Sequence, residues 1–241
     1  GLWRSLWDVA FAASSALLPV LLGAALGNVL RGVPLDASGA FNLPLFTHGG
    51  VSNPVGILDW YTVLVGLFAL AMLAGHGALF LAWKTDGPVQ ARSASAARVA
   101  WLLVGLFWGP VSLATGAVSP ALFERFPAAP LAWMAALVVL AGVVLLTHGM
   151  NRGRWKLAFF GSCGLIVGLL AGAAAMVFPD LLRSTLDSAH SLNAWNASSS
   201  TAGLRKALVW WLVGIPLVAL YFTNLFRLHR GKVAAAPEGE G

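Results

Sequence analysis

The sequence predicts an all-α membrane protein, a polytopic bundle of about six transmembrane helices, and three observations support this. Of 241 residues, 59% are hydrophobic and 10% are charged, whereas an ordinary soluble domain has roughly 25% charged residues. The apolar residues form runs of about 20, the length that crosses the hydrocarbon core of a bilayer. The charged residues gather in short clusters between these runs. A soluble fold of this size has too little interior to bury so much apolar surface.

Six stretches are long and apolar enough to span a membrane. In chain order they are 6–30, 60–83, 97–119, 130–150, 155–178 and 207–226. Period-2 alternation is absent, which disfavours a β-barrel, and a helix satisfies its own backbone hydrogen bonds in lipid. Pro19, Pro110 and Pro216 fall within spans and are expected to bend them locally. We expect residues 1–233 to form one transmembrane domain and the small, acidic segment 234–241 to be a disordered tail.

Two connections are long enough to cover one end of such a bundle. Residues 31–59 contain Pro34, Pro44 and Pro54 with several glycines, and residues 179–206 contain a polar run near their C-terminal end. Segments of this composition read as irregular loops. We expect both to form ordered caps over the bundle rather than separate domains.

The charge distribution predicts how the spans are oriented. With the N-terminus in the cytoplasm, ten basic residues flank the inner ends of the spans and five flank the outer ends. The inner ones are Arg4, Lys84, Arg92, Arg98, Arg152, Arg154, Lys156, Arg227, Arg230 and Lys232, and the outer ones are Arg31, Arg125, Arg183, Arg205 and Lys206. The positive-inside rule favours this orientation, with both ends of the chain cytoplasmic. The basic excess therefore reflects membrane flanks and does not indicate a nucleic-acid partner.

Glycine spacing predicts where helices approach one another. Gly164, Gly168 and Gly172 recur at every fourth position of the fifth span. Small residues at this spacing let a neighbouring helix come close, which is how packing drives association in lipid. Gly23 and Gly27 of the first span permit the same interpretation, or they reflect only the abundance of glycine in the chain, which has 27.

No motif for an autonomous enzyme is present. The chain has no phosphate loop, no dinucleotide fingerprint and no paired histidine and carboxylate at metal spacing, so no catalytic, cofactor-binding or metal-binding residue is assigned. Polar residues near or inside spans are functional candidates by default, and Asp8, Asn28 and His76 are of this kind. His76 lies about 12 Å inside the Lys84 end of its span. It could ligate haem or relay protons, or it could form a hydrogen bond across a glycine-lined helix contact, which is the commoner role.

Short motifs in a fixed order resemble subunit II of cytochrome bd-type quinol oxidases. Their positions are Trp7–Asp8, Gly27–Asn28, Arg31–Asp36, His76–Ala78 followed by Lys84–Thr85, Met176–Asp180 and Ser191–Ser199. Each motif alone is unspecific, but their order and separations resemble the family over nearly the whole chain. The family usually has about nine helices, so the resemblance implies that this chain corresponds to the last six and lacks roughly the first hundred residues. The start without methionine agrees with this expectation.

The resemblance implies a function. Such oxidases reduce dioxygen to water with electrons from quinol, and they take protons from the cytoplasmic side. The haems, b and d, belong to subunit I, with which subunit II forms a heterodimer, and subunit II supports the assembly and contributes to proton supply. The acidic residues assigned to the proton route lie in the part expected to be absent, so no proton-path residue is carried over. Membrane lipid is a further expected partner, and the sequence leaves open whether a quinone sits structurally against the subunit.

Two rival functions remain at this stage. One is a secondary transporter or permease, which would need broken helices and convergent polar residues at mid-membrane. The other is an enzyme that itself carries haem, held by His76 and His148. His148 is expected near the inner surface and His76 deeper in the lipid, so sharing one iron would require a substantial offset between the helices.

Overall fold

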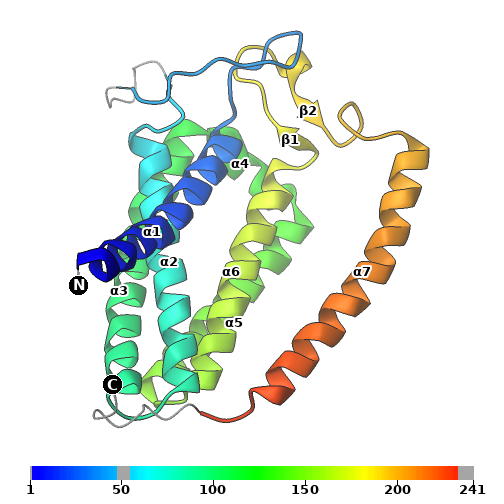
Figure 1. Ribbon diagram of the computed structural model, residues 1–241. Coiled ribbons are helices and arrows are strands. Elements are labelled where there is room, and N and C mark those ends of the chain that lie inside the picture. The colour runs from blue at the N-terminus through cyan, green and yellow to red at the C-terminus, as the bar shows by residue number, and fades with distance from the viewer. Residues whose placement is uncertain (1, 48–54, 233–241) are drawn as a thin grey trace.

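The computed structural model describes residues 2–47 and 55–232 and shows a helical bundle (Figure 1). Its helices are α1 (Leu2–Arg31), α2 (Trp60–Lys84), α3 (Gly87–Val118), α4 (Pro120–Arg125), α5 (Pro130–Asn151), α6 (Trp155–Val177) and α7 (Thr201–Leu228). Within the described ranges six of these helices, all except α4, are long and apolar enough to cross a membrane. The predicted fold class is therefore confirmed. The expected tail at 234–241 lies outside the described residues.

Several helices extend beyond the predicted apolar segments. The helix α3 begins at Gly87 rather than at residue 97, with a proline in its first turn, and α7 begins at Thr201, where the side chain of Ser200 accepts a hydrogen bond from the Gly203 amide. Hydropathy marks only the part of a helix that crosses lipid, whereas caps and a first-turn proline set where the helix starts. The short helix α4 and a two-stranded antiparallel ribbon of β1 (Asp180–Leu182) and β2 (Leu192–Asn193) were not predicted.

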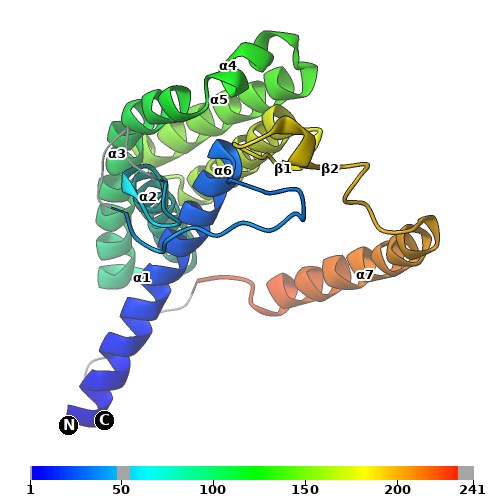
Figure 2. The same ribbon diagram turned by 90° about the horizontal axis from the view of Figure 1, so that it is seen from above.

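The bundle is built around α2, which packs against α1, α3 and α6, while α5 packs along α6. The core where these helices meet consists of buried small and apolar side chains. They are Ala71, Met72, Leu79, Ala97, Trp101, Val104, Leu146, Ala158 and Leu165. In both views α7 stands apart from this bundle (Figures 1 and 2), and it has no buried residue. One long apolar helix is thus left without a neighbour along its length in the described part of the chain.

Glycines form the contact between α5 and α6, and of the three predicted positions Gly168 takes part in the closest approach. A Cβ atom built on Gly149 would lie 2.5 Å from the Ala158 nitrogen, and one built on Gly168 would lie 2.8 Å from Val139. The same construction at Gly164 and Gly172 meets its nearest atoms at 3.7 and 3.5 Å, which is ordinary contact. Residues seven apart on a helix differ by only about 20° in direction, whereas residues eight apart differ by about 80°. The close contact therefore follows the seven-residue steps Gly161–Gly168 and Gly142–Gly149 rather than the predicted steps of four.

The first span also uses glycine. A Cβ atom built on Gly23 would lie 2.8 Å from the Gly66 Cα atom of α2, and one built on Gly27 would lie 3.4 Å from Thr62. Gly23 is therefore at a close approach between the backbones of α1 and α2, which a larger residue would push apart.

Candidate functional site

The described parts of the two long connections lie together at one end of the bundle, which we call the outer end (top of Figure 1). The Val33 amide donates to the Arg183 carbonyl at 3.0 Å, and the Thr185 amide donates to the Val33 carbonyl at 3.0 Å. The Ser184 hydroxyl donates to the Leu35 carbonyl at 2.8 Å. The expected ordered cap is therefore confirmed for these parts of both connections.

A buried ion pair ties this cap to the helices. Arg31 at the end of α1 pairs with Asp59, and their side chains are only 8% and 5% exposed. The Arg31 guanidinium also donates to Oδ1 of Asn28 at 2.6 Å and to the Gly56 carbonyl at 3.0 Å. Asn28 in turn donates through Nδ2 to the Ile57 carbonyl at 2.9 Å. Asn28 therefore connects α1 to the segment that precedes α2.

Asp59 has a second role as the N-cap of α2. Its Oδ1 accepts the backbone amides of Tyr61 and Thr62, each at 3.1 Å, and Thr62 Oγ1 accepts the Asp59 amide at 2.9 Å. Burial acts to raise the pKa of Asp59, but hydrogen bonds from the Thr62 backbone and from Arg31 outweigh it and hold that pKa below its ordinary value of 3.8. One carboxylate thus starts a transmembrane helix and neutralises a buried guanidinium.

Arg183 extends the same network across the outer end. Its guanidinium donates to the Arg31 carbonyl at 2.9 Å and to the hydroxyl of Ser119, which follows α3. Arg125 approaches Asp180 at 3.8 Å in a more exposed pair. The outer cations Arg31, Arg125 and Arg183 therefore each meet a carboxylate, a carbonyl or a hydroxyl.

A second polar site lies within the membrane-spanning part of the bundle. Nδ1 of His76 on α2 is 2.7 Å from Oγ of Ser162 on α6, and the His76 ring stacks on Phe159 with ring centres 4.6 Å apart. The Ser162 hydroxyl donates to the Phe159 carbonyl at 2.6 Å. Because a hydroxyl has a single proton, Nδ1 of His76 must be the donor to Ser162. The imidazole therefore forms a hydrogen bond across the contact between α2 and α6.

The structure does not bring His76 and His148 together. His76 is eight residues from the C-terminal end of α2, or about 12 Å along the helix, whereas His148 is three residues from the end of α5, or about 4.5 Å. His148 is exposed, and the recorded polar and aromatic contacts of His76 are Ser162 and Phe159. Within the described ranges no group of three or more His, Cys, Asp and Glu side chains gathers that could hold a metal ion. These residues therefore do not fit the two-histidine haem site that the sequence suggested.

The remaining candidate, Asp8, lies exposed on the first third of α1. The sequence-based list also missed the partners that give its members their environment: Asp59, Ser119, Ser162 and Arg183. Asp59 had a recognisable signal, because an aspartate followed by threonine three residues later, just before an apolar run, is typical of a helix start. The other three had no such local signal.

Comparison with known proteins decides the family. The family model described as cytochrome bd terminal oxidase subunit II matches residues 1–229. This chain belongs to that family. Membership confirms the resemblance drawn from the motifs and gives no support to the permease interpretation. The motifs at Arg31–Asp36, Met176–Asp180 and Ser191–Ser199 have parts in the outer cap, where Val33 bridges to Ser184 and Asp180 pairs with Asn193.

Curated relatives in this family come from several bacteria. The chain is 26% identical to cytochrome bd-I ubiquinol oxidase subunit 2 of Escherichia coli over an alignment of 247 residues. The alignment covers 91% of this chain and 63% of the relative. It is 27% identical to cytochrome bd ubiquinol oxidase subunit 2 of Bacillus subtilis, with 90% of this chain and 60% of the relative covered. For a probable cytochrome oxidase subunit 2 of Haemophilus influenzae the identity is 26%, over 92% of this chain and 64% of the relative. The chain thus spans less than two thirds of their length.

The apolar helices and these bacterial relatives together place the cytochrome bd subunit II chain in a membrane. Six helices of the described part of the chain are long and apolar enough to cross the bilayer, and the relatives are subunits of bacterial bd-type oxidases. It is therefore a multi-pass protein of the bacterial inner membrane.

Proposed function

We propose that this chain acts as part of subunit II of a bd-type terminal quinol oxidase, the non-haem subunit of a heterodimer. The observation that carries the proposal is the family match over residues 1–229. In the complex, quinol supplies electrons, dioxygen is reduced to water, and the protons consumed come from the cytoplasm. Haems b and d belong to the partner subunit, so this chain supports the redox centres and contributes to proton supply without performing the electron transfer itself.

The surface of the chain suits a subunit of a larger membrane assembly. No residue of α7 is buried, although the helix carries large side chains such as Trp210, Trp211 and Phe222, which are 77%, 60% and 49% exposed. A membrane helix this apolar contacts lipid or other helices on every side. This supports a haem-bearing partner subunit, membrane lipid and a structural quinone as the candidates for covering it.

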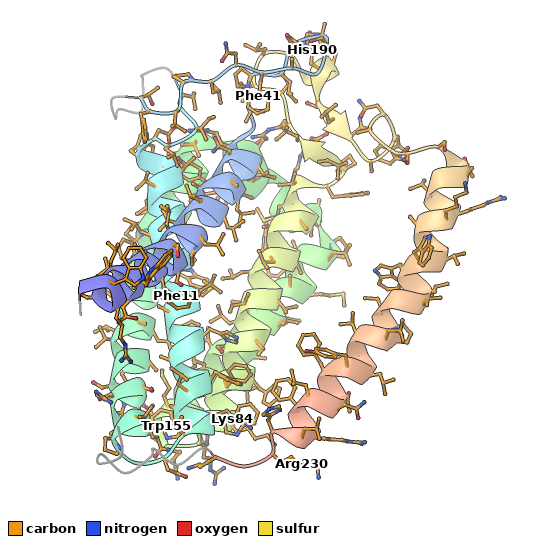
Figure 3. All side chains as sticks on the ribbon, viewed as in Figure 1. Phe11, Phe41, Lys84, Trp155, His190 and Arg230 are labelled. Carbon is orange, nitrogen blue, oxygen red and sulfur yellow. The ribbon has the colours of Figure 1, made fainter. Side chains whose placement is uncertain are left out.

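The orientation belongs to the same proposal: the C-terminal end faces the cytoplasm. Its support is the basic end of the bundle, opposite the outer cap, where Lys84, Trp155 and Arg230 lie while His190 lies at the other end (Figure 3). Positive-inside topology puts such an end in the cytoplasm. Reporter fusions after Thr85 and after Arg230 should both report a cytoplasmic position, and a fusion after Asp187 should report the opposite side. If either of the first two reported the periplasmic side, this orientation would be refuted.

Affinity purification of the full gene product tests the oxidase role. A tag on the C-terminal end should recover a larger subunit together with haem absorbance and quinol-dependent oxygen consumption. His76→Ala is the informative variant, because the haem signals should persist if haem belongs to the partner. Recovery of the tagged protein without a second large subunit and without haem would overturn the proposal.

A further inference from the structure

A cavity at the basic end of the molecule is not explained by the oxidase role. It has a volume of about 630 Å³ and lies between the ends of α2, α6 and α7. Four cationic side chains line it: Lys84, Lys156, Arg230 and Lys232. They come from three separate parts of the chain, and Figure 3 shows Lys84 and Arg230 at this same end. The fold therefore gathers positive charge here that the sequence leaves dispersed.

Most of this charge is unmatched within the part of the chain that the structure describes. Lys232 pairs with Asp86 at 2.6 Å, with both side chains about half exposed. Lys84 donates through Nζ to the His229 carbonyl at 2.7 Å, which holds the segment after α7 against the end of α2. Lys156 and Arg230 are exposed, and neither makes an ion pair with a described carboxylate. Two cations of the cavity, Lys156 and Arg230, thus have no described carboxylate partner, and we call them the free cations. The other two, Lys84 and Lys232, make contacts within the chain.

The walls of the cavity are aromatic. Trp83, Phe159, Phe160 and Phe226 line it, and the Trp83 ring lies 5.5 Å from that of Phe159 and 5.9 Å from that of Phe160. The Lys84 ammonium lies over the Trp83 ring at 5.3 Å. A cavity lined by both aromatic and cationic side chains, at the ends of the membrane-spanning helices, matches a ligand with an anionic head and a hydrocarbon tail.

We propose that this cavity binds one anionic phospholipid of the inner leaflet. Its headgroup phosphate accepts hydrogen bonds from Arg230 and Lys156, and an acyl chain lies against Phe159, Phe160 and Phe226 in the space between α6 and α7. Arginine donates to phosphate in a bidentate geometry, and basic pockets between transmembrane helices on the cytoplasmic side select anionic lipids. A free phosphate would gain nothing from the aromatic wall. This lipid would also give α7 a neighbour where the described protein gives it none.

Native mass spectrometry of the purified complex, freed of lipid and then titrated, tests the proposal. The probes are phosphatidylglycerol, cardiolipin and phosphatidylcholine in detergent, with inorganic phosphate as competitor. One anionic lipid should bind to the subunit at least about tenfold more tightly than phosphatidylcholine, and millimolar phosphate should not displace it. Equal affinity for the zwitterionic lipid, or displacement by phosphate alone, would overturn the proposal.

A double substitution with a matched control locates the site. Lys156→Gln with Arg230→Gln removes the two free cations but leaves the Lys84 and Lys232 contacts intact, and it should weaken anionic-lipid binding on the order of tenfold. Arg92→Gln with Arg152→Gln removes two exposed cations from the same end without touching the cavity, and it should change the affinity less than about twofold. Equal losses in the two pairs would show a general charge effect and no built site.

The acidic C-terminal segment 234–241 is an alternative occupant of the cavity, and Phe226→Ala distinguishes it from a lipid. The change shortens the apolar wall and leaves every cation, so a lipid should lose affinity while a bound carboxylate segment would be unaffected. Unchanged lipid affinity in this variant would refute the acyl-chain position. Oxygen consumption measured on the same samples reports separately on the oxidase role.

Discussion

The charged residues at the two ends of the bundle differ in burial and in pairing. At the outer end Arg31 and Asp59 are paired and buried, with side chains 8% and 5% exposed, and Arg183 binds the Arg31 carbonyl and Ser119. At the basic end, which we call the inner end, the ion pair of Lys232 with Asp86 has side chains that are 45% and 54% exposed. Lys156 and Arg230 are exposed there without a described carboxylate partner. The charged pair at the outer end is therefore buried, whereas these charged residues at the inner end are exposed.

The difference follows from the cost of burying charge. A buried ion is tolerated only when it is paired and hydrogen-bonded, so Arg31 at the outer end is a fixed part of the fold. An exposed cation contributes little to stability and stays available to other charges. The buried pair at the outer end therefore serves stability, whereas the exposed cations at the inner end stay available to other charges. Substitutions at the two ends should separate these roles.

Removal of the buried carboxylate should have the largest effect. Asp59→Asn leaves the Arg31 guanidinium buried and uncompensated, and breaking such a pair costs about 3–5 kcal/mol. The helix start is expected to persist, because asparagine also caps helices. Thermal unfolding of the detergent-purified protein should show the loss as a large fall in the midpoint.

Asp86→Asn is the matched control at the inner end. It makes the same change in an ion pair whose side chains are 54% and 45% exposed, where the expected cost is below about 1 kcal/mol. Equal losses for the two variants would remove the distinction between the ends.

The next effect concerns the arginine that joins the cap to the helices. Arg183→Gln removes charged hydrogen bonds to the Arg31 carbonyl and to Ser119, which should cost roughly 1.5–3 kcal/mol. Arg205→Gln on α7 removes an exposed arginine and should be nearly neutral. The thermal unfolding midpoints of the two variants provide the comparison. A neutral Arg183→Gln variant would show that the cap does not depend on this side chain.

The sequence was sufficient to predict the membrane-spanning helices but not how they pack against one another. Span length and hydropathy are one-dimensional, so six spanning helices, their order and the family motifs could be found without a structure. The pairing of Arg31 with Asp59 joins residues 28 positions apart, and that of His76 with Ser162 joins residues 86 positions apart. No local pattern encodes such contacts, because they depend on which helix faces lie together.

The glycine contact shows the same limit within a single helix. Three glycines spaced by four predicted close packing of the fifth span. Of these, Gly168 lies against the neighbouring backbone, together with Gly161, which was not among them. Which glycines lie at the contact depends on the face that α6 turns towards α5, and the packing of all the helices determines that face. The same rotation of α6 about its axis places Ser162 beside His76 of α2, so it also determines the intramembrane polar site.

A pair of alanine substitutions tests this register in the helices that separate the two ends. Gly168→Ala puts a methyl group 2.8 Å from Val139, with backbone atoms at 2.9 Å behind it, and should cost roughly 1 kcal/mol or more through overpacking. Gly164→Ala meets its nearest atom at 3.7 Å and should be neutral or slightly stabilising, because alanine is the better helix former. Equal falls in the two thermal midpoints would show that Gly164 and Gly168 both lie at the close contact, as the steps of four predicted.

Acid should act on the outer end through Asp59, with the smallest effect of the four. Its pKa is held below the ordinary value of 3.8 in the folded protein, so its contribution to the free energy of unfolding is complete above pH 3.8. That contribution falls as the pH drops through the lowered pKa. Thermal unfolding midpoints measured from pH 6 to pH 3 should therefore fall at the lowest pH values. The fall should be less steep in the Asp59→Asn variant. Asp36, whose pKa the Ser38 hydroxyl lowers, leaves a residual slope in that variant.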